Sequence, residues 1–350
     1  MKRSLRRFLQ RRGATDTEID NAARHHYLAL LVLDREVTPG ARKYTIAQLA
    51  DRGGTDVATA RTLWRAIGFP DLPDDLPAFT DADVAALRAL ARRIESGAVI
   101  EWTVERALSQ ARVLSSSLAR VADAETDDLA RSVRLAQEAG LDDEQLAELF
   151  ATRLDFDEIA RLIDHAHRLQ LRAAVWRRLA GVGPSTPGAL HGAVGFVDLV
   201  GYTALAMELD IEELGALVTR FGDLAHDTVV AAGGRIVKTI GDEVMFVTDT
   251  ATAAATIALR LTERSTGDDL LPDTRAGVAF GSLLSREGDY FGPVVNLASR
   301  LTELARPGQV LASAEVAAAL TPLTDVAARR LGSRRIRDIG RVEVFRLERA

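Results

Sequence analysis

The chain has 350 residues, of which 47 % are hydrophobic and 27 % charged, a composition typical of a folded protein of about two domains. Its formal net charge of −6 argues against general affinity for nucleic acid or anionic membranes. It has no cysteine, which excludes disulfides, thiolate metal sites and thiol nucleophiles, and we expect a cytoplasmic protein.

The N-terminal segment carries no signal for membrane insertion. The apolar run from Tyr27 to Leu33 is far shorter than the ~20 residues that a membrane span requires. Met1 to Arg12 is basic and is followed by no apolar core or cleavage site, so we expect no secretory signal. Leu5, Phe8 and Leu9 share one side of this segment, which predicts a helix docked on its own domain; binding to a membrane surface is the alternative.

Residues 1 to 180 show apolar residues at helical spacing, with glycine and proline between the segments. Thr55-Asp56, Thr80-Asp81 and Asp142 precede helical patterns and offer capping side chains. We predict an all-α domain of about eight to ten helices, the last from about Asp155 to Leu179. The glycine- and proline-rich stretch 181–190 predicts a linker to a domain at 191–350.

Two other interpretations of the helical half stay open. Tyr44 to Ala50, a turn at Gly53-Gly54 and Val57 to Ile67 have the layout of a helix-turn-helix, which suggests a DNA-linked signalling protein. Equal numbers of basic and acidic residues from Arg42 to Glu95 argue against it, and we expect no nucleic-acid partner. Alternatively, helices around residues 27–33 and 107–118 enclose a cavity for a lipid or other small-molecule ligand.

Four of the six histidines lie in the helical half: His25, His26, His165 and His167. Histidine is the side chain that changes charge closest to physiological pH, so these residues are candidates for acid sensing. His165 and His167 lie in the helix that leads to the linker, where protonation would alter how that helix packs. The alternative for each is an ordinary solvated or core histidine.

After residue 190 short apolar strands alternate with helices. This pattern predicts an α+β domain with one sheet covered by helices. We expect strands at 193–197, 235–240, 243–248, 274–279 and 309–313, and helices at 211–232, 251–263 and 294–304.

Two isolated carboxylates suggest a metal site in this domain. Asp198 follows an apolar strand and Asp242 lies at a tight hairpin, so both could meet at one end of the sheet. Magnesium is usually bound by one or two carboxylates plus phosphate oxygens, and two such ions can assist a phosphoryl displacement. Gly201, Tyr202 and Thr203 open a loop-to-helix junction whose amides could hold phosphate groups. The alternative is a pair of aspartates that cap turns.

Further residues point to a phosphorylated substrate. Lys238 is one of only three lysines among 44 basic residues, which suggests a ligand-binding role for its ammonium group. Asn296 and Arg300 are four residues apart and share one helix face. An arginine there can neutralise charge that develops on a reacting phosphate.

The motifs FVDLVGYT (196–203), KTIGDEVMF (238–246) and DYFGPVVNLASR (289–300) stand in the family order and spacing of class III adenylate cyclases, or nucleotidyl cyclases. The chain resembles their catalytic domain, of ferredoxin-like or palm-type fold, over residues 190 to 345. By this resemblance two Mg²⁺ or Mn²⁺ ions are bound by Asp198 and Asp242, with the carbonyl of Leu199 as a further ligand.

The resemblance also assigns roles around the nucleotide. Lys238 and Asp289 would read adenine, Asn296 would orient the ribose and Arg300 would stabilise the transition state. Arg275 would contact the terminal phosphates; a strand-edge charge is the alternative.

The implied reaction converts ATP to 3′,5′-cyclic AMP and pyrophosphate. Sites in this family form between two catalytic domains, so one domain per chain implies a homodimer. The helical half more weakly resembles the regulatory region of actinobacterial soluble cyclases, some of which respond to acid. The alternatives are a guanylate cyclase and a non-catalytic signalling protein that retains the fold.

Overall fold

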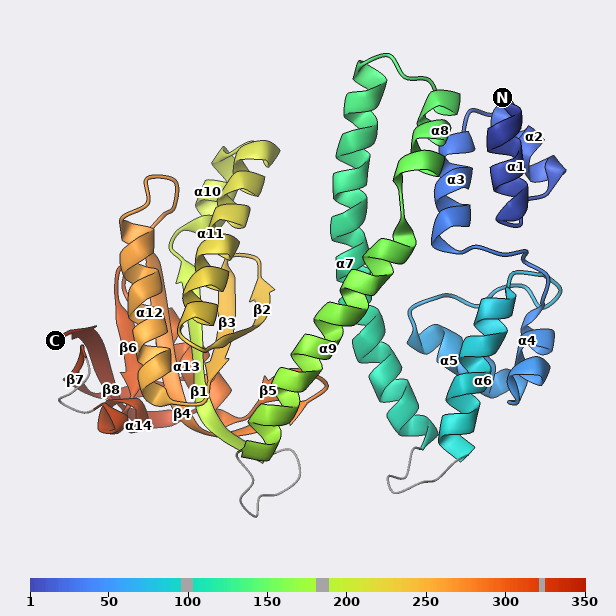
Figure 1. Cartoon of the computed structure of the whole chain (residues 1–350). Coiled ribbons are helices and arrows are strands. Elements are labelled where there is room, and N and C mark those ends of the chain that lie inside the picture. Colours follow the sequence, from blue (N-terminus) through green and yellow to red (C-terminus); the bar gives the residue numbers. More distant parts are fainter. Residues whose placement is uncertain (96–102, 181–188, 321–324) are drawn as a thin grey trace. The chain divides into compact units, whose positions relative to one another are not determined.

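The protein is described by a computed structural model over residues 1–95, 103–180, 189–320 and 325–350. It divides into two compact units, Met1–Gly181 and Val182–Ala350 (Figure 1). Residues 181–188 of the predicted linker lie outside the described ranges, and Ala189 and Leu190 already belong to the first strand. No helix in the described ranges is long and apolar enough to cross a membrane.

The first unit is helical throughout its described elements, as predicted. Side-chain caps begin several helices: Asp56 and Asp142, for example, accept backbone N–H bonds of 2.9 and 2.8 Å from Thr59 and Gln145. The helices are α1 (Arg3–Arg11), α2 (Asp16–Arg24), α3 (Leu28–Val37), α4 (Ile46–Gly53), α5 (Val57–Ala66), α6 (Asp81–Glu95), α7 (Val104–Glu138), α8 (Asp143–Arg153) and α9 (Phe156–Ala180).

Two separate apolar clusters stabilise this unit. One joins α1, α2, α3 and α8 and includes Leu9, Ile19 and Phe150, so the basic N-terminal helix docks on its own unit as predicted. The other joins α4, α5 and α6 around Phe79. Residues 27–33 belong to the first cluster, and α7 contacts that cluster through Leu129 and Val133. Residues 107–118 lie in an earlier part of α7, where the hydroxyl of Ser115 donates to the carbonyl of Ile67 at the end of α5. The two segments proposed to enclose a ligand cavity therefore pack in different places.

The second unit contains one mixed sheet with the strand order β2-β3-β1-β4-β6-β8-β7, and β5 pairs with β4. β4 and β6 are parallel, and the other pairs are antiparallel. The strands are β1 (Ala189–Leu199), β2 (Arg235–Ile240), β3 (Glu243–Thr248), β4 (Thr274–Arg286), β5 (Asp289–Phe291), β6 (Val310–Ser313), β7 (Val326–Ile336) and β8 (Gly340–Arg349). The helices are α10 (Tyr202–Glu208), α11 (Ile211–Ala231), α12 (Ala251–Thr266), α13 (Pro293–Leu304) and α14 (Ala314–Ala319).

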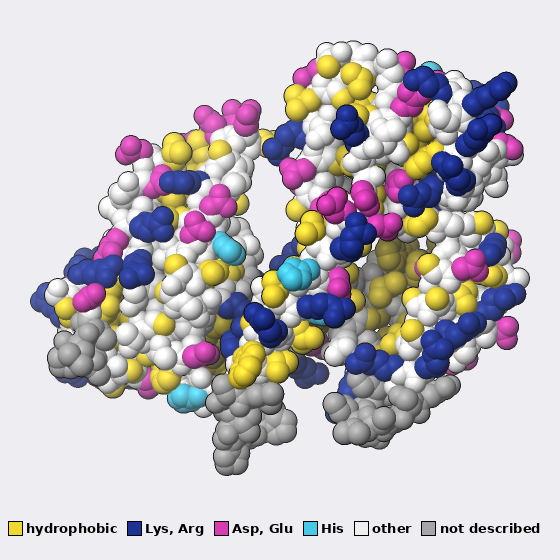
Figure 2. Space-filling model, in the orientation of Figure 1, with side chains coloured by type: hydrophobic (Ala, Val, Ile, Leu, Met, Phe, Trp, Pro, Cys, Tyr) yellow, Lys and Arg dark blue, Asp and Glu magenta, His cyan; other side chains and the backbone are white. Residues whose placement is uncertain are grey.

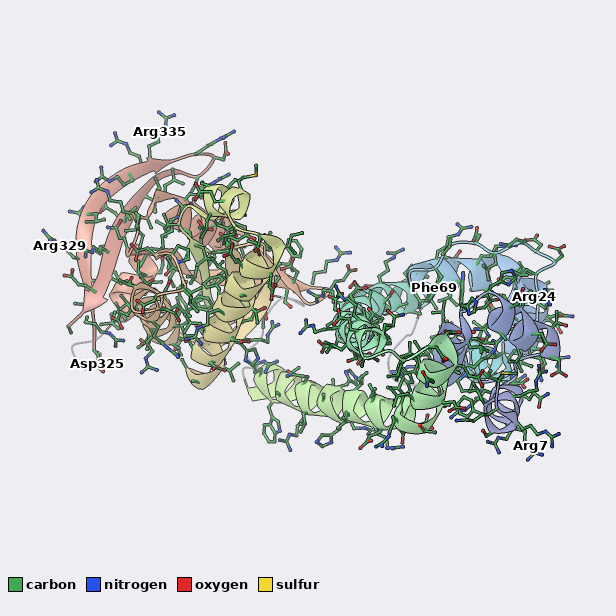
Figure 3. The ribbon with its side chains drawn as sticks, turned by 90° about the horizontal axis from the view of Figure 1, so that it is seen from above. Arg7, Arg24, Phe69, Asp325, Arg329 and Arg335 are labelled. Carbon is green, nitrogen blue, oxygen red and sulfur yellow. The ribbon has the colours of Figure 1, made fainter. Side chains whose placement is uncertain are left out.

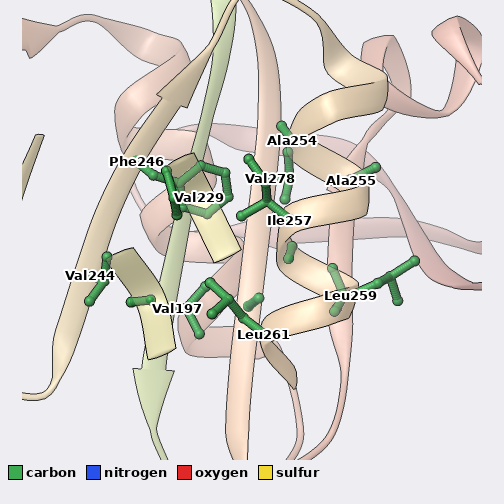
Figure 4. Close-up of a cluster of buried hydrophobic side chains, with 14 of the residues drawn as sticks. Val197, Val229, Val244, Phe246, Ala254, Ala255, Ile257, Leu259, Leu261 and Val278 are labelled. Carbon is green, nitrogen blue, oxygen red and sulfur yellow. The ribbon is translucent and has the colours of Figure 1, made fainter. Parts of the chain in front are cut away.

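Helices cover both faces of the sheet. On one face α11 and α12 pack on the strands through a large cluster that includes Val197, Val229, Phe246 and Ile257 (Figure 4). On the other face α13 packs on β1, β4 and β6. The contact with β4 depends on Gly277, because a Cβ atom there would lie 2.3 Å from the carbonyl oxygen of Ala298. The position of α13 over the sheet is therefore set by the absence of a side chain at residue 277.

The sequence underestimated the sheet. The strands predicted at 193–197 and 274–279 extend to 189–199 and 274–286, and β7 and β8 were not predicted. Arginines interrupt the apolar alternation of β7, and Arg329 and Arg335 project from it (Figure 3). Alternation identifies only strands with one clearly apolar face, so a strand this polar escapes it.

We expect Gly277→Ala to destabilise the second unit by roughly 2–3 kcal/mol, because the new methyl group would overlap backbone atoms of α13. Gly222→Ala is the matched control: it lies inside α11 with no atom within 4 Å of its added Cβ. It should stabilise the helix by roughly 0.5–1 kcal/mol. Thermal unfolding of both variants measures the two changes in stability. Equal melting temperatures for the two variants would contradict the close contact between α13 and β4.

Candidate active site

A row of charged side chains crosses three neighbouring strands on the α13 face of the sheet. Arg275 on β4 pairs in register with Asp198 on β1, and Asp198 pairs with Glu243 on β3. Side chains two residues apart on a strand share a face, and Phe196 and Met245, the next pair along, belong to the cluster beneath α13. The row therefore brings a predicted metal ligand and a predicted phosphate ligand together.

Arg275 neutralises Asp198 directly. Its Nε and Nη2 atoms donate to Oδ2 of Asp198 at 2.8 and 2.6 Å, and its Nη1 atom donates to the carbonyl of Glu303 at 3.3 Å. β4 lies inside the sheet between β1 and β6, so the alternative interpretation of Arg275 as a strand-edge charge is wrong. Contact between Arg275 and phosphate stays a prediction.

Asp242 lies next to this row. It follows Gly241, which adopts a φ of 62° in the turn between β2 and β3. The carbonyl of Asp242 accepts the N–H of Leu199 at 3.2 Å. Burial raises the pKa of Asp242, and the charge of Asp198 adds to this rise. Burial, together with the charges of Asp198 and Asp242, raises the pKa of Glu243 to about 7. Three carboxylates are thus crowded around one arginine.

These residues fit a divalent cation. They offer hard oxygen donors. A cation there would offset the cost of burying charged carboxylates and their mutual repulsion, the two effects that raise the pKa values of Asp242 and Glu243. No cluster of three histidine, aspartate or glutamate side chains within the described ranges has the arrangement of a complete metal cage. Water and phosphate oxygens would complete the coordination, as is usual for Mg²⁺. Leu199 is buried, with 1 % of its surface exposed. A ligand role for its carbonyl stays a prediction.

Lys238 and Asp289, the predicted base-reading residues, form an ion pair. The Nζ atom of Lys238 donates to Oδ2 of Asp289 at 2.5 Å, and the N–H of Tyr290 donates to Oδ1 at 2.8 Å. Burial pushes the pKa of Asp289 upward, but these hydrogen bonds outweigh it and hold that pKa below its ordinary value. The carboxylate therefore stays charged and able to accept further hydrogen bonds.

A groove of about 440 Å³ lies beside the row. Three predicted residues from two elements line it: Lys238 from β2, and Asn296 and Arg300 from α13. The Nη1 atom of Arg300 is held by both carboxylate oxygens of Glu303 at 2.6 and 2.8 Å. The remaining lining residues are Phe196, Ile240, Glu243, Met245, Val295, Ser299, Arg337, Asp338 and Ile339.

Sequence reasoning missed several of these residues. Glu243 had a usable signal, because it directly follows Asp242 and opens a strand whose next same-face residue, Met245, is apolar. Arg337 had none, because it lies in the turn between β7 and β8, which the sequence did not predict.

The loop after β1 leads into the short helix α10. Gly201 adopts a φ of 75° and begins α10, whose first turn contains Tyr202 and Thr203. The ring of Tyr202 packs against the main core cluster, whereas Thr203 is exposed. Phosphate binding by these three residues stays a prediction.

The four candidate regulatory histidines are all exposed and form two pairs that are far apart in the sequence. The Nδ1 atom of His25 is 3.0 Å from the carbonyl of Asn21, and its ring stacks on Tyr27. His26 follows with a φ of 56°. His165 and His167 lie on α9 beside an ion pair between Asp164 and Arg168.

Fold and site together define a nucleotidyl cyclase. Residues 191–349 match the family described as the adenylate and guanylate cyclase catalytic domain. The chain is 37 % identical over 297 residues to an adenylate cyclase of Glutamicibacter nicotianae, covering 81 % of this chain and 73 % of that one. It is 37 % identical over 298 residues to an adenylate cyclase of Streptomyces coelicolor, covering 85 % and 77 %. The chain belongs to the class III adenylate cyclases.

The similarity also reaches into the helical half. A pH-sensitive adenylate cyclase of Mycobacterium tuberculosis is 31 % identical over 331 residues, which cover 91 % of this chain and 82 % of that one. Since the catalytic match begins at residue 191, an alignment of that length includes most of the helical unit. The two units thus occur together in this relative.

Glu243 predicts a pH dependence of stability. Its raised pKa means that the fold favours the protonated carboxyl, so its stabilisation is complete below the ordinary value of 4.5 and is lost as pH rises through about 7. Glu243→Gln stays neutral, so its melting temperature relative to the parent should rise between about pH 5 and about pH 8. Glu208→Gln, at an exposed position, is the control. If the difference in melting temperature between Glu243→Gln and the parent changed with pH no more than that of the control, the prediction would be refuted.

Proposed function

We propose that this protein converts ATP to 3′,5′-cyclic AMP and pyrophosphate at sites shared between two copies of the chain. The observation that carries the proposal is the convergence of Lys238, Asn296 and Arg300 on one groove. These residues come from a strand and a helix, and each supplies the chemistry that a nucleoside triphosphate needs. The rival interpretation, a non-catalytic protein with the same fold, does not explain why all three line one groove.

The base-reading pair favours ATP over GTP. The ammonium of Lys238 can donate to a ring nitrogen of adenine while the carboxylate of Asp289 accepts from the exocyclic amine. Guanine presents a carbonyl and a ring N–H at these positions, so it would need the opposite arrangement. A guanylate cyclase is therefore the less favoured alternative.

Asp198 and Asp242 would hold Mg²⁺ or Mn²⁺, two ions per site by the family resemblance. When bound, these ions would polarise the reacting oxygens and neutralise the triphosphate. Arg275 is already paired with Asp198, so contact with a terminal phosphate would exchange one anionic partner for another.

The reaction itself needs positioning and charge neutralisation more than covalent participation by the protein. The amide of Asn296 would hold the ribose so that the 3′-hydroxyl faces the α-phosphorus. Arg300 would leave Glu303 and donate to the α-phosphate as its charge increases. Both residues lie on α13, so a single helix sets their spacing.

The shared site implies a complementation test. Asp198→Ala and Arg300→Ala should each abolish cyclic AMP formation from ATP, because each lesion affects both sites of a homodimer. An equimolar mixture that exchanges subunits should regain about a quarter of the parent activity: half of the dimers are mixed, and each has one intact site. Activity at the parent level in either single variant, or none in the mixture after verified exchange, would count against the proposal.

We also propose that the helical unit regulates the catalytic unit in a cytoplasmic enzyme, with acid as the input. Support comes from the exposed His165 and His167 on α9, the last helix before the catalytic unit, and from the pH-sensitive relative. Histidine side chains reach the surface in Figure 2. Basic and acidic residues are equally numerous from Arg42 to Glu95, which gives no support to DNA binding.

His165→Ala combined with His167→Ala should flatten the dependence of cyclase activity on pH between about 5.5 and about 8, where histidine titrates. Activity is measured as cyclic AMP formed from saturating ATP. His226→Ala is the control, since its side chain on α11 is also exposed, at 68 %. A double variant with the parent's profile would exclude this pair as the sensor.

A further inference from the structure

The short strand β5, which carries Asp289, is attached to the sheet on one side only. Among the described strands it pairs with β4 alone, through Ser285 and its neighbours, and Phe291 at its end is 49 % exposed. Two side-chain bridges join it to β2, which forms the far edge of the same sheet. One is the ion pair between Lys238 and Asp289.

The second bridge joins Arg235 and Tyr290. The Nη2 atom of Arg235 donates to the hydroxyl oxygen of Tyr290 at 2.7 Å, and its guanidinium carbon lies 5.4 Å from the centre of the ring. Both the hydrogen bond and the cation–π contact are partly buried. Arg235 and Tyr290 line neither the groove nor the row of carboxylates described above.

A β-bulge in β2 makes the two bridges compatible. Residues three apart in a regular strand face opposite sides of the sheet. Here the register shifts between Ile236 and Lys238, so that Arg235 pairs with Val247 and Lys238 with Met245. Val247 and Met245 share a face, and the bulge therefore places Arg235 and Lys238 on that same face. The bulge thus lets one edge strand bind two consecutive residues of β5.

We infer that Arg235 and Tyr290 are positioning residues that hold Asp289 at the correct distance from Lys238 for recognition of adenine. This inference rests on the function proposed above. The Lys238 and Asp289 side chains are 35 % and 31 % exposed, and ion pairs this accessible to solvent are weak restraints by themselves. The neighbouring bridge restrains the backbone of β5 and so the direction of the carboxylate. Tyr290 acts through Asp289 and does not touch the base.

The test compares Tyr290→Phe with Tyr44→Phe in the full-length chain. Tyr290→Phe removes the hydroxyl that accepts from Arg235 but keeps the ring. Tyr44→Phe removes one comparable hydrogen bond, to Asp81 at 2.8 Å, in the helical unit. We expect the KM for ATP to rise roughly three- to tenfold in Tyr290→Phe, with kcat changed less than about twofold and the ATP:GTP ratio of kcat/KM lowered. Tyr44→Phe should change none of these.

A double variant separates positioning from a general loss of structure. In an Asp289→Asn background, Tyr290→Phe should lower the ATP:GTP ratio no further, because its effect passes through the carboxylate. Arg235→Lys, which keeps a cation and a donor, should have an intermediate effect. A Tyr290→Phe variant with the parent's KM and base preference, or additive losses in the double variant, would overturn the inference.

Hydrogen–deuterium exchange gives a readout that does not need catalysis. Amides of residues 284–292 should exchange faster in Tyr290→Phe than in the parent or in Tyr44→Phe, because one of the two bridges to β2 is lost. If the parent made no cyclic AMP, the proposed function would fail while exchange still decided whether the bridge restrains β5. Unchanged exchange in this segment would refute the restraint in either case.

Discussion

The close approach of α13 to β4 is the constraint on which the site depends. α13 carries Asn296 and Arg300, while the strands beneath carry Asp198 and Lys238. Any side chain at Gly277 would overlap the backbone of α13 at Ala298 and Thr302. Backbone contact therefore fixes the position of the helix relative to the sheet. Such a contact yields less than a contact between flexible side chains.

Around this frame most of the charged side chains of the site have a partner of opposite charge. Arg275 holds Asp198, Glu303 holds Arg300, and Lys238 holds Asp289. Asp242 and Glu243 are the exceptions, and their raised pKa values reflect carboxylates whose burial and crowding outweigh their favourable contacts. A polyanionic substrate with its cations could exchange partners with these pairs one by one. Such exchanges cost less than leaving a buried charge without any partner.

The sequence predicted the fold class and the helical half well, because both depend on strong local signals. Capping residues such as Asp56 and Asp142 mark helix starts, and apolar strands such as β3 stand out from their surroundings. It missed β7 and β8, whose exposed arginines hide the alternation of a strand. Because the turn between these strands was not predicted, the groove residues that it carries were not predicted either: Arg337, Asp338 and Ile339.

For the site, the motifs identified individual residues but not their partners. Asp198 was recognisable by its position after an apolar strand, whereas its bond to Arg275, 77 positions away in the sequence, depends on the register between β1 and β4. Similarly, no local pattern shows that β2 has a bulge at Val237. Pairing across strands depends on long-range contacts that a single sequence does not display.

The two outer strands of the sheet have a consequence for solubility. β2 and β7 each leave a row of backbone N–H and C=O groups without a neighbouring strand in the described sheet, and such rows can template the addition of further chains. The irregular register of β2 interrupts one row, and like-charged side chains such as Arg329 and Arg335 would repel a second molecule at the other (Figure 3). Thus the same bulge that directs Arg235 toward Tyr290 also makes this edge a poor template for aggregation.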